Sequence, residues 1–160
     1  MNVPRTVAMA ACILLSLPVA AQDEAVTALL GDWAADCDAW GTPATCRLSW
    51  ERGHHERLLT VRYRIESRQD GAEIFSGSAV YRLSPPDLTG YWSDSGGALH
   101  PLRAMWEDNT LTTRWGRPGT EEGRTEYARL APGVLRVTDW ALTDEGWRQF
   151  MQVTYDRRQP

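Results

Sequence analysis

Hydrophobic and polar residues alternate along most of this 160-residue chain. The alternation is strict over residues 46–51 and 59–66, and it returns in short segments as far as residue 155. Successive side chains of an extended strand point to opposite faces, so the pattern predicts half-buried β-strands. A helical period is confined to residues 23–30. We therefore expect a short N-terminal helix followed by strands.

Turn signals separate the expected strands at short and regular intervals. They include Asp70-Gly71, Ser95-Gly96-Gly97 and Pro132-Gly133. None of the connections is long enough to hold a crossover helix, so neighbouring strands should pair antiparallel. A meander of this length closes on itself or splits into two sheets, and the absence of long connections favours closure. The expected fold is all-β, an antiparallel up-and-down β-barrel of about 8–10 strands.

The first 21 residues have the pattern of a secretory signal peptide. Arg5 precedes an apolar run over residues 7–17, and small residues follow at 18–21, which predicts cleavage before Gln22. The run is too short to span a bilayer. We expect a signal peptide over 1–21, a single barrel domain over 22–160, a periplasmic or secreted location, and no stable membrane insertion.

The charge pattern excludes one class of partner. All 17 basic residues are arginine, and 21 acidic residues give a net charge of −4. Nucleic-acid binding needs a basic stripe, which this sequence lacks, so no nucleic-acid partner is expected. The arginines recur singly along the strands, as on the solvated outside of a barrel.

Two cysteines, Cys37 and Cys46, remain in the expected mature chain. An exported protein meets an oxidising compartment, so we expect a disulfide between them. The segment between them contains Gly41 and Pro43 and is expected to form a hairpin loop. A disulfide across this loop stabilises the folded state by roughly 2–3 kcal/mol in the chain-entropy model. Their spacing differs from the CxxC of redox-active pairs, which favours the structural role.

Gly31 and Trp33 stand where the helical segment meets the first expected strand. Glycine permits a tight turn and close approach, and tryptophan buries a large apolar area. This G-x-W, the exported chain, the short helix and the antiparallel meander together resemble the lipocalin-like proteins of the calycin superfamily. The resemblance implies a small apolar ligand in the barrel, with a few members acting as enzymes. It predicts that Trp33 packs across one barrel end, near an arginine or the lead-in helix.

Aromatic residues on the predicted inward faces are candidates for a ligand cavity. The sequence has 8 tryptophans and 5 tyrosines. Their rings would either line a cavity for a hydrophobic or planar ligand or fill a small core completely. Trp40, in the expected cysteine-flanked loop, is either exposed, as a lid or a carbohydrate platform, or folded back as a plug. The candidate ligand-binding residues are Trp50, Tyr63, Tyr81, Trp92, Trp106, Trp115 and Asp139.

Asp139 is the one charged residue among these candidates. It shares an expected face with Leu135 and Val137. A carboxylate among apolar residues must be paired or protonated. One interpretation is an ion pair with an inward arginine. The other is a polar anchor for a ligand, or an acid or base of an isomerase or cyclase working with Tyr63, Tyr81 and Tyr127.

The histidines do not predict a metal site. His54 and His55 are adjacent, so on an extended chain they point to opposite sides. We expect no metal, no cofactor and no assigned catalytic residue. The favoured function is non-catalytic binding of a small hydrophobic or aromatic molecule. The alternatives are an enzyme on the same barrel and a solid-cored envelope protein; the sequence leaves the oligomeric state open.

Overall fold

The computed structural model describes residues 19–84 and 87–159, with side chains from residue 23 onward. Most of the expected signal peptide, residues 1–18, lies outside this range. One helix precedes ten strands: α1 Val19–Leu29, β1 Gly31–Ala39, β2 Thr42–Arg52, β3 Leu58–Ser67, β4 Glu73–Ser84, β5 Asp87–Asp94, β6 Leu99–Glu107, β7 Thr110–Gly116, β8 Glu122–Ala131, β9 Val134–Thr143 and β10 Gly146–Arg157. The helix was expected over 23–30.

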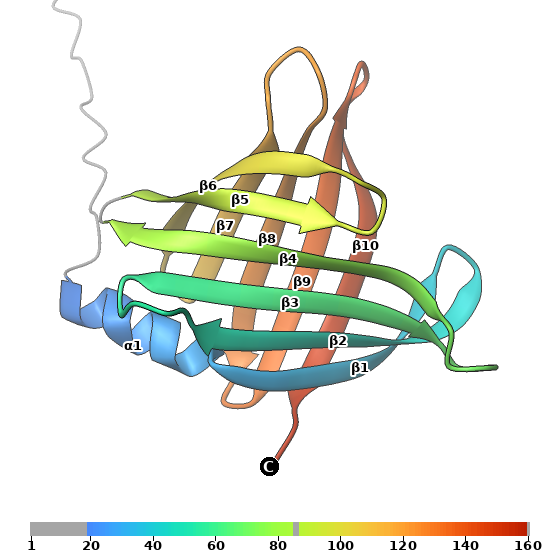
Figure 1. The fold of residues 1–160 in the computed structure, drawn as a ribbon, viewed down its shortest axis with the longest axis horizontal. Helices are drawn as coiled ribbons and strands as arrows, with labels where there is room; N and C mark the ends of the chain where they lie inside the picture. The colour runs from blue at the N-terminus through green and yellow to red at the C-terminus, as the bar shows by residue number, and fades with distance from the viewer. Residues whose placement is uncertain (1–18, 85–86, 160) are drawn as a thin grey trace, which may run out of the picture.

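The ten strands form a closed antiparallel barrel in which each strand pairs with its neighbours in sequence. Strands β1–β5 cross in front of β7–β10, which gives the barrel the form of two layers at a steep angle (Figure 1). The seam between β1 and β10 is short, with the pairs Trp33↔Arg157 and Ala34↔Asp156. The expected fold class, an up-and-down barrel with an N-terminal helix, is confirmed.

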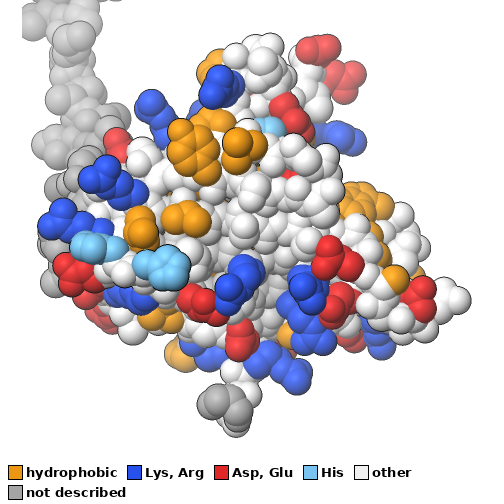
Figure 2. All heavy atoms as spheres, in the orientation of Figure 1, with side chains coloured by type: hydrophobic (Ala, Val, Ile, Leu, Met, Phe, Trp, Pro, Cys, Tyr) orange, Lys and Arg blue, Asp and Glu red, His pale blue; other side chains and the backbone are white. Residues whose placement is uncertain are grey.

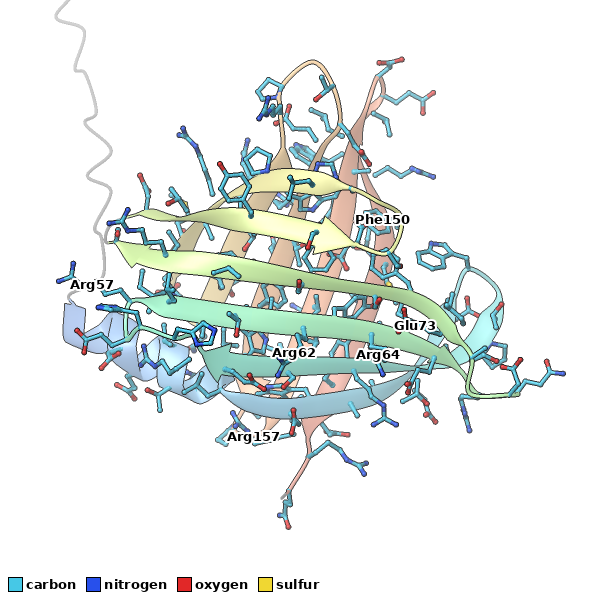
Figure 3. The ribbon with its side chains drawn as sticks, viewed as in Figure 1. Arg57, Arg62, Arg64, Glu73, Phe150 and Arg157 are labelled. Atoms are coloured by element: carbon cyan, nitrogen blue, oxygen red, sulfur yellow. A yellow bond between two sulfur atoms is a disulfide. The ribbon has the colours of Figure 1, made fainter. Side chains whose placement is uncertain are left out.

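The alternation of the sequence produces the two faces of the barrel wall. On β2 the inward residues Ala44, Cys46, Leu48 and Trp50 are all buried, while Arg47 between them is exposed. Arginines also project from the outer face of β3 (Figure 3). Acidic and basic side chains are interspersed over the face drawn in Figure 2. A mixed charged surface of this kind keeps the outside solvated.

Helix α1 closes one end of the barrel. Val26 and Leu29 are fully buried against the core. Trp33 Nε1 donates a hydrogen bond to the Leu29 carbonyl at 2.8 Å. The guanidinium of Arg157 lies 4.3 Å from the centroid of the Trp33 ring. Both of the neighbours expected for Trp33, an arginine and the lead-in helix, thus lie against it.

The β1–β2 hairpin is tighter than the sequence suggested. Its turn is Trp40-Gly41, where both residues have positive φ, of 52° and 91°. Two such residues form the type I′ turn, whose twist matches the flanking strands. Cys37 and Cys46 therefore lie within the paired strands rather than around a loop. Their sulfur atoms are 2.09 Å apart, at disulfide distance.

No helix among the described residues is long and apolar enough to cross a membrane.

Candidate ligand-binding cavity

The barrel contains a cavity of about 250 Å³ whose lining includes Trp40, at the tip of the β1–β2 hairpin. This hairpin tip lies at the end of the barrel away from α1 (Figure 1). The inner wall of the cavity includes Tyr81, Tyr127 and Asp139, and its mouth includes Trp40 and Phe150. Trp40 is 63% exposed at the tip of the β1–β2 hairpin, and Phe150 is 40% exposed on β10 (Figure 3).

The cavity occupies one half of the interior because side chains fill the other half. Trp50 pairs in register with Gly31, beside α1, and is 1% exposed. Its ring stacks on Tyr81 with centroids 6.0 Å apart and meets Tyr127 edge-on at 5.1 Å. Trp106 is also packed against the core. Of the seven candidates, Tyr63, Tyr81, Trp92, Trp115 and Asp139 line the cavity, whereas Trp50 and Trp106 do not.

Two glycines let tryptophans lie flat against the barrel wall. A Cβ atom at Gly123 would be 1.8 Å from Trp115 Cζ2, and one at Gly77 would be 2.2 Å from Trp92 Cζ2. Each glycine therefore makes room for a ring that a larger residue would displace. Phe75 stacks on Trp92 with centroids 6.4 Å apart and planes inclined by 16°. The cavity thus has a broad aromatic wall.

Asp139 is the carboxyl group on the inner wall. Thr125 Oγ1, on the neighbouring strand β8, donates a hydrogen bond to Asp139 Oδ1 at 2.6 Å. Burial raises the pKa of the Asp139 carboxyl to about 6, and the bond from Thr125 partly offsets this increase. Within the described residues no arginine lines this cavity and no ion pair involves Asp139, so the ion pair considered from the sequence is not formed.

Tyrosine hydroxyls surround this carboxyl group and remain protonated. Burial raises the pKa of Tyr81 to about 12. Burial also raises the pKa values of Tyr63, Tyr127 and Tyr155, and the charge of Asp139 adds to each increase. Tyr81 shares a hydrogen bond of 3.2 Å with Thr113. The inner wall therefore offers neutral hydroxyl groups and one carboxyl group to a ligand.

The mouth combines aromatic and charged groups. Trp40 meets Phe75 edge-on at 6.4 Å, so this exposed ring also contacts the cavity wall. His100 packs against Trp115 with centroids 5.4 Å apart. Its Nε2 is 3.6 Å from Glu121 Oε2, which comes from the connection between β7 and β8. These contacts hold the mouth without closing it.

Sequence reasoning passed over several lining residues. Thr125, Phe75 and Phe150 were not among the candidate ligand-binding residues. Thr125 alternates with Gly123 and Tyr127 along β8, which begins at Glu122. Extending the two-residue alternation from Tyr127 by two positions toward the N-terminus places Thr125 inward. Phe150 follows no simple alternation, because the register of β10 shifts between Gln149 and Met151.

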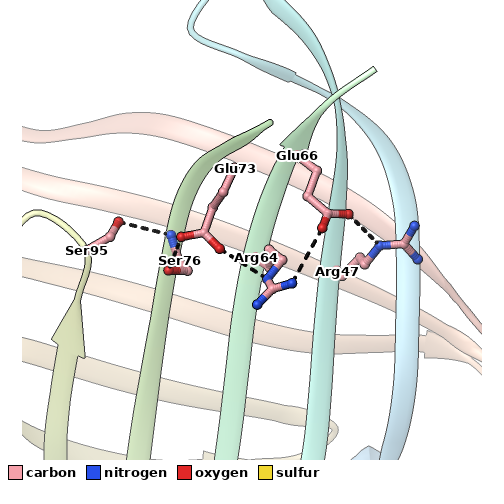
Figure 4. A network of polar contacts seen from close by, with 6 residues as sticks. All are labelled: Arg47, Arg64, Glu66, Glu73, Ser76 and Ser95. Atoms are coloured by element: carbon pink, nitrogen blue, oxygen red, sulfur yellow. Dashed lines mark hydrogen bonds and ion pairs between the residues drawn. The ribbon is translucent and has the colours of Figure 1, made fainter. Parts of the chain in front are cut away.

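A larger hollow, of about 650 Å³, lies against the wall formed by β1–β5. Its lining includes arginines on β2 and β3, but their charges are already paired. Arg47 and Arg64 lie 3.1 and 3.6 Å from the two oxygens of Glu66, and Arg64 is also 3.3 Å from Glu73 (Figure 4). Exposed pairs of this kind form a solvated network. The interior cavity is the better candidate site.

The part of the chain that the structure describes contains no group of three or more metal-ligating side chains. His54 and His55 are exposed in the connection between β2 and β3.

The fold and the site together define a small closed antiparallel barrel with an aromatic interior cavity. No protein-family model matches the chain, and no curated protein matches it in sequence. The crystal structure of Rv2717c from M. tuberculosis is similar, with a TM-score of 0.66 over 85% of this chain and 96% of that protein. The two sequences are 12% identical, and the likeness is one of fold.

Proposed function

We propose that this chain is an exported, non-catalytic barrel protein that binds a small hydrophobic or aromatic molecule in its interior. The observation that carries the proposal is the cavity of about 250 Å³, closed at one end by α1 and lined by aromatic side chains. Ligand sites are typically concave and largely apolar, with a few polar groups that fix orientation. Asp139 and the tyrosine hydroxyls are such groups here.

The size of the cavity limits the size of the ligand. An apolar cavity of about 150 Å³ holds one benzene ring, and drug-sized ligands occupy about 300–1,000 Å³. A volume of about 250 Å³ suits a molecule with one or two rings and a short substituent. An interior cavity of this size also argues against the alternative function, that of an envelope protein with a solid core.

Membership of the lipocalin-like group of the calycin superfamily is part of the same proposal. Gly31 and Trp33 carry the resemblance, and the contact of Trp33 with Arg157 and with the end of α1 supports it. Export is proposed on the signal-peptide pattern of residues 1–21 and on the disulfide, which an oxidising compartment maintains. N-terminal sequencing of protein recovered from the envelope tests export, and Gln22 is the expected first residue.

Ligand binding is tested by native mass spectrometry of protein purified from its own envelope, followed by calorimetric titration with 2-naphthol, a neutral aromatic probe. A Trp115→Ala variant removes a cavity wall and should weaken binding. The matched control is Trp140→Ala, because Trp140 lies on the outside of β9 beneath Arg124, with its centroid 4.2 Å from the guanidinium carbon. Equal effects of the two variants, or no binding to the wild type, would overturn the proposal.

An enzyme on the same barrel is the second candidate, and the state of Asp139 favours it. A carboxyl group with a pKa of about 6 is suited to general acid–base catalysis near neutral pH. The expected chemistry is proton removal beside a carbonyl group held by a tyrosine hydroxyl. The test is whether the wild type, but not Asp139→Asn, speeds deuterium exchange at the α-carbon of a small aromatic ketone.

A further inference from the structure

The charges around the cavity are strongly one-sided. Three carboxyl groups line it, from Asp94, Glu121 and Asp139, and His100 is the one basic side chain in the described lining. The sequence contains no lysine. An anionic ligand such as a fatty acid would therefore enter a cavity that holds carboxylates and lacks an arginine partner.

Two of the three carboxyl groups already have partners in the protein. Asp94 accepts hydrogen bonds from Trp92 Nε1 at 2.8 Å and from the backbone of Gly96 and Ala98 at 2.9 and 3.1 Å. Glu121 faces His100 at the mouth. These two groups fix a turn and the rim, so their charges are largely satisfied.

Asp139 differs because one of its oxygens is left for a ligand. Oδ1 accepts the bond from Thr125, while Oδ2 receives no hydrogen bond from any described residue. The group borders the cavity on the inner wall and is only partly exposed. A carboxylate in such a place is costly unless an opposite charge or a donor joins it. A ligand in the cavity can supply that partner.

The aromatic wall suits the same kind of partner. The rings of Phe75, Trp92 and Trp115 line the cavity together with three tyrosines. Aromatic faces carry partial negative charge and attract ammonium groups, most strongly where water is excluded. A carboxylate beside several aromatic rings is therefore complementary to an organic cation with an apolar body.

We infer that the ligand is a small aromatic or aliphatic amine in its cationic form, with its ammonium group against Asp139 and its apolar body among the aromatic rings. This inference rests on the proposed function, since it requires that the cavity binds a ligand. Asp139 supplies the counter-charge, and Thr125 orients the carboxylate so that Oδ2 is presented to the cavity. The aromatic residues supply contact area and further attraction for the cation.

Three ligands that differ mainly in charge test the inference by calorimetric titration at pH 8. They are the cation 2-phenylethylammonium, the neutral 2-phenylethanol and the anion 3-phenylpropanoate. The wild type should bind the cation at least about tenfold more tightly than the alcohol, and the anion more weakly still. This ranking requires no variant, so it does not depend on whether a substituted protein folds.

The Asp139→Asn variant should lose at least about tenfold in affinity for the cation and keep its affinity for the alcohol within about threefold. The matched control is Asp144→Asn, which removes the same charge from the exposed turn between β9 and β10. It should leave all three affinities unchanged. Equal affinity of the wild type for cation and alcohol, or unchanged cation affinity in Asp139→Asn, would overturn the inference while the proposed function stands. Failure of all three ligands to bind would overturn both.

Discussion

The guanidinium of Arg157, on the last strand, covers the indole ring of Trp33, on the first, at 4.3 Å. The two residues are register partners at the seam between β1 and β10. Arg157 also donates hydrogen bonds to the carbonyl groups of Ala28 and Leu30, where α1 ends. The last residues of a helix leave carbonyl groups without intrahelical partners, and a cation is favourable there. One arginine thus joins the helix end, the first strand and the last strand.

Replacing Arg157 with alanine should destabilise the protein by about 1–3 kcal/mol. The substitution removes the cation over Trp33 and leaves the carbonyl groups at the end of α1 to water. Urea unfolding followed by tryptophan fluorescence measures the change. Arg136→Ala is the matched control, because Arg136 is exposed on the outer face of β9. A control variant as destabilised as Arg157→Ala would refute the special role of this contact.

Asp139 should make the protein less stable at high pH than at low pH. Its pKa is raised from 3.8 to about 6 in the fold, so between these values the folded state holds more protons than the unfolded chain. Stability from this group is therefore present at acid pH and lost as the pH rises through 6, by up to about 3 kcal/mol. Asp139→Asn removes the charge and should be more stable than the wild type at pH 8.

The measurement for this prediction is urea unfolding of the wild type and Asp139→Asn between pH 4 and pH 8. Carboxyl groups common to both proteins cancel in the difference between them. We expect the advantage of the variant to shrink toward zero near pH 4, where the wild-type group is protonated as well. An advantage that does not vary with pH would show that burial does not raise this pKa.

Binding of a permanent cation should weaken as the pH falls through about 6, because protonation removes the negative charge of Asp139. Benzyltrimethylammonium is suitable, since its own charge does not titrate. His100 is the basic side chain in the described lining of the cavity, so the profile should be repeated in His100→Gln. Persistence of the same pH dependence in Asp139→Asn would contradict the prediction. The groups facing Asp139 or sharing its cavity are Thr125, Tyr63, Tyr81, Tyr127, Tyr155, Asp94, His100 and Glu121.

Gly123→Ala should displace Trp115, because the added Cβ would lie 1.8 Å from the ring. Forced repacking of this kind costs about 1–3 kcal/mol, and the displaced ring would enter the ligand space. Thermal unfolding and titration with 2-naphthol measure the two effects. The double variant Gly123→Ala/Trp115→Phe has a smaller ring. Its losses of stability and of affinity for 2-naphthol should be smaller than the summed losses of the two single variants. Simple additivity of the two changes would argue against a direct clash.

Reducing the disulfide should lower the free energy of unfolding by roughly 2–3 kcal/mol, as expected for a loop of this length. Cys37 and Cys46 are nine residues apart and join β1 to β2 next to the mouth. Urea unfolding with and without a reductant gives the difference. The Cys37→Ala/Cys46→Ala variant should match the reduced protein and be insensitive to the reductant. A reductant effect that persists in this variant would have another source.

The two-residue alternation and the short turns were sufficient to predict the antiparallel barrel, since both are local properties of the chain. The same alternation placed Tyr63, Tyr81, Trp92, Trp115 and Asp139 on inward faces. Gly31 and Trp33 indicated where the barrel begins. These features depend on the direction of a side chain from its own strand, which the sequence encodes directly.

The tertiary structure decided how far along the barrel axis each inward-facing residue lies. Trp50 and Trp92 have the same inward pattern in the sequence, yet Trp50 packs near α1 and Trp92 lines the cavity. Their difference follows from the stagger of the strands around the closed barrel and from which end the helix covers. The pairing of Thr125 with Asp139 and the free second oxygen likewise arise from strand register and packing. Local pattern determined which residues face inward, and the closed packing of ten strands decided which of them leave space between them.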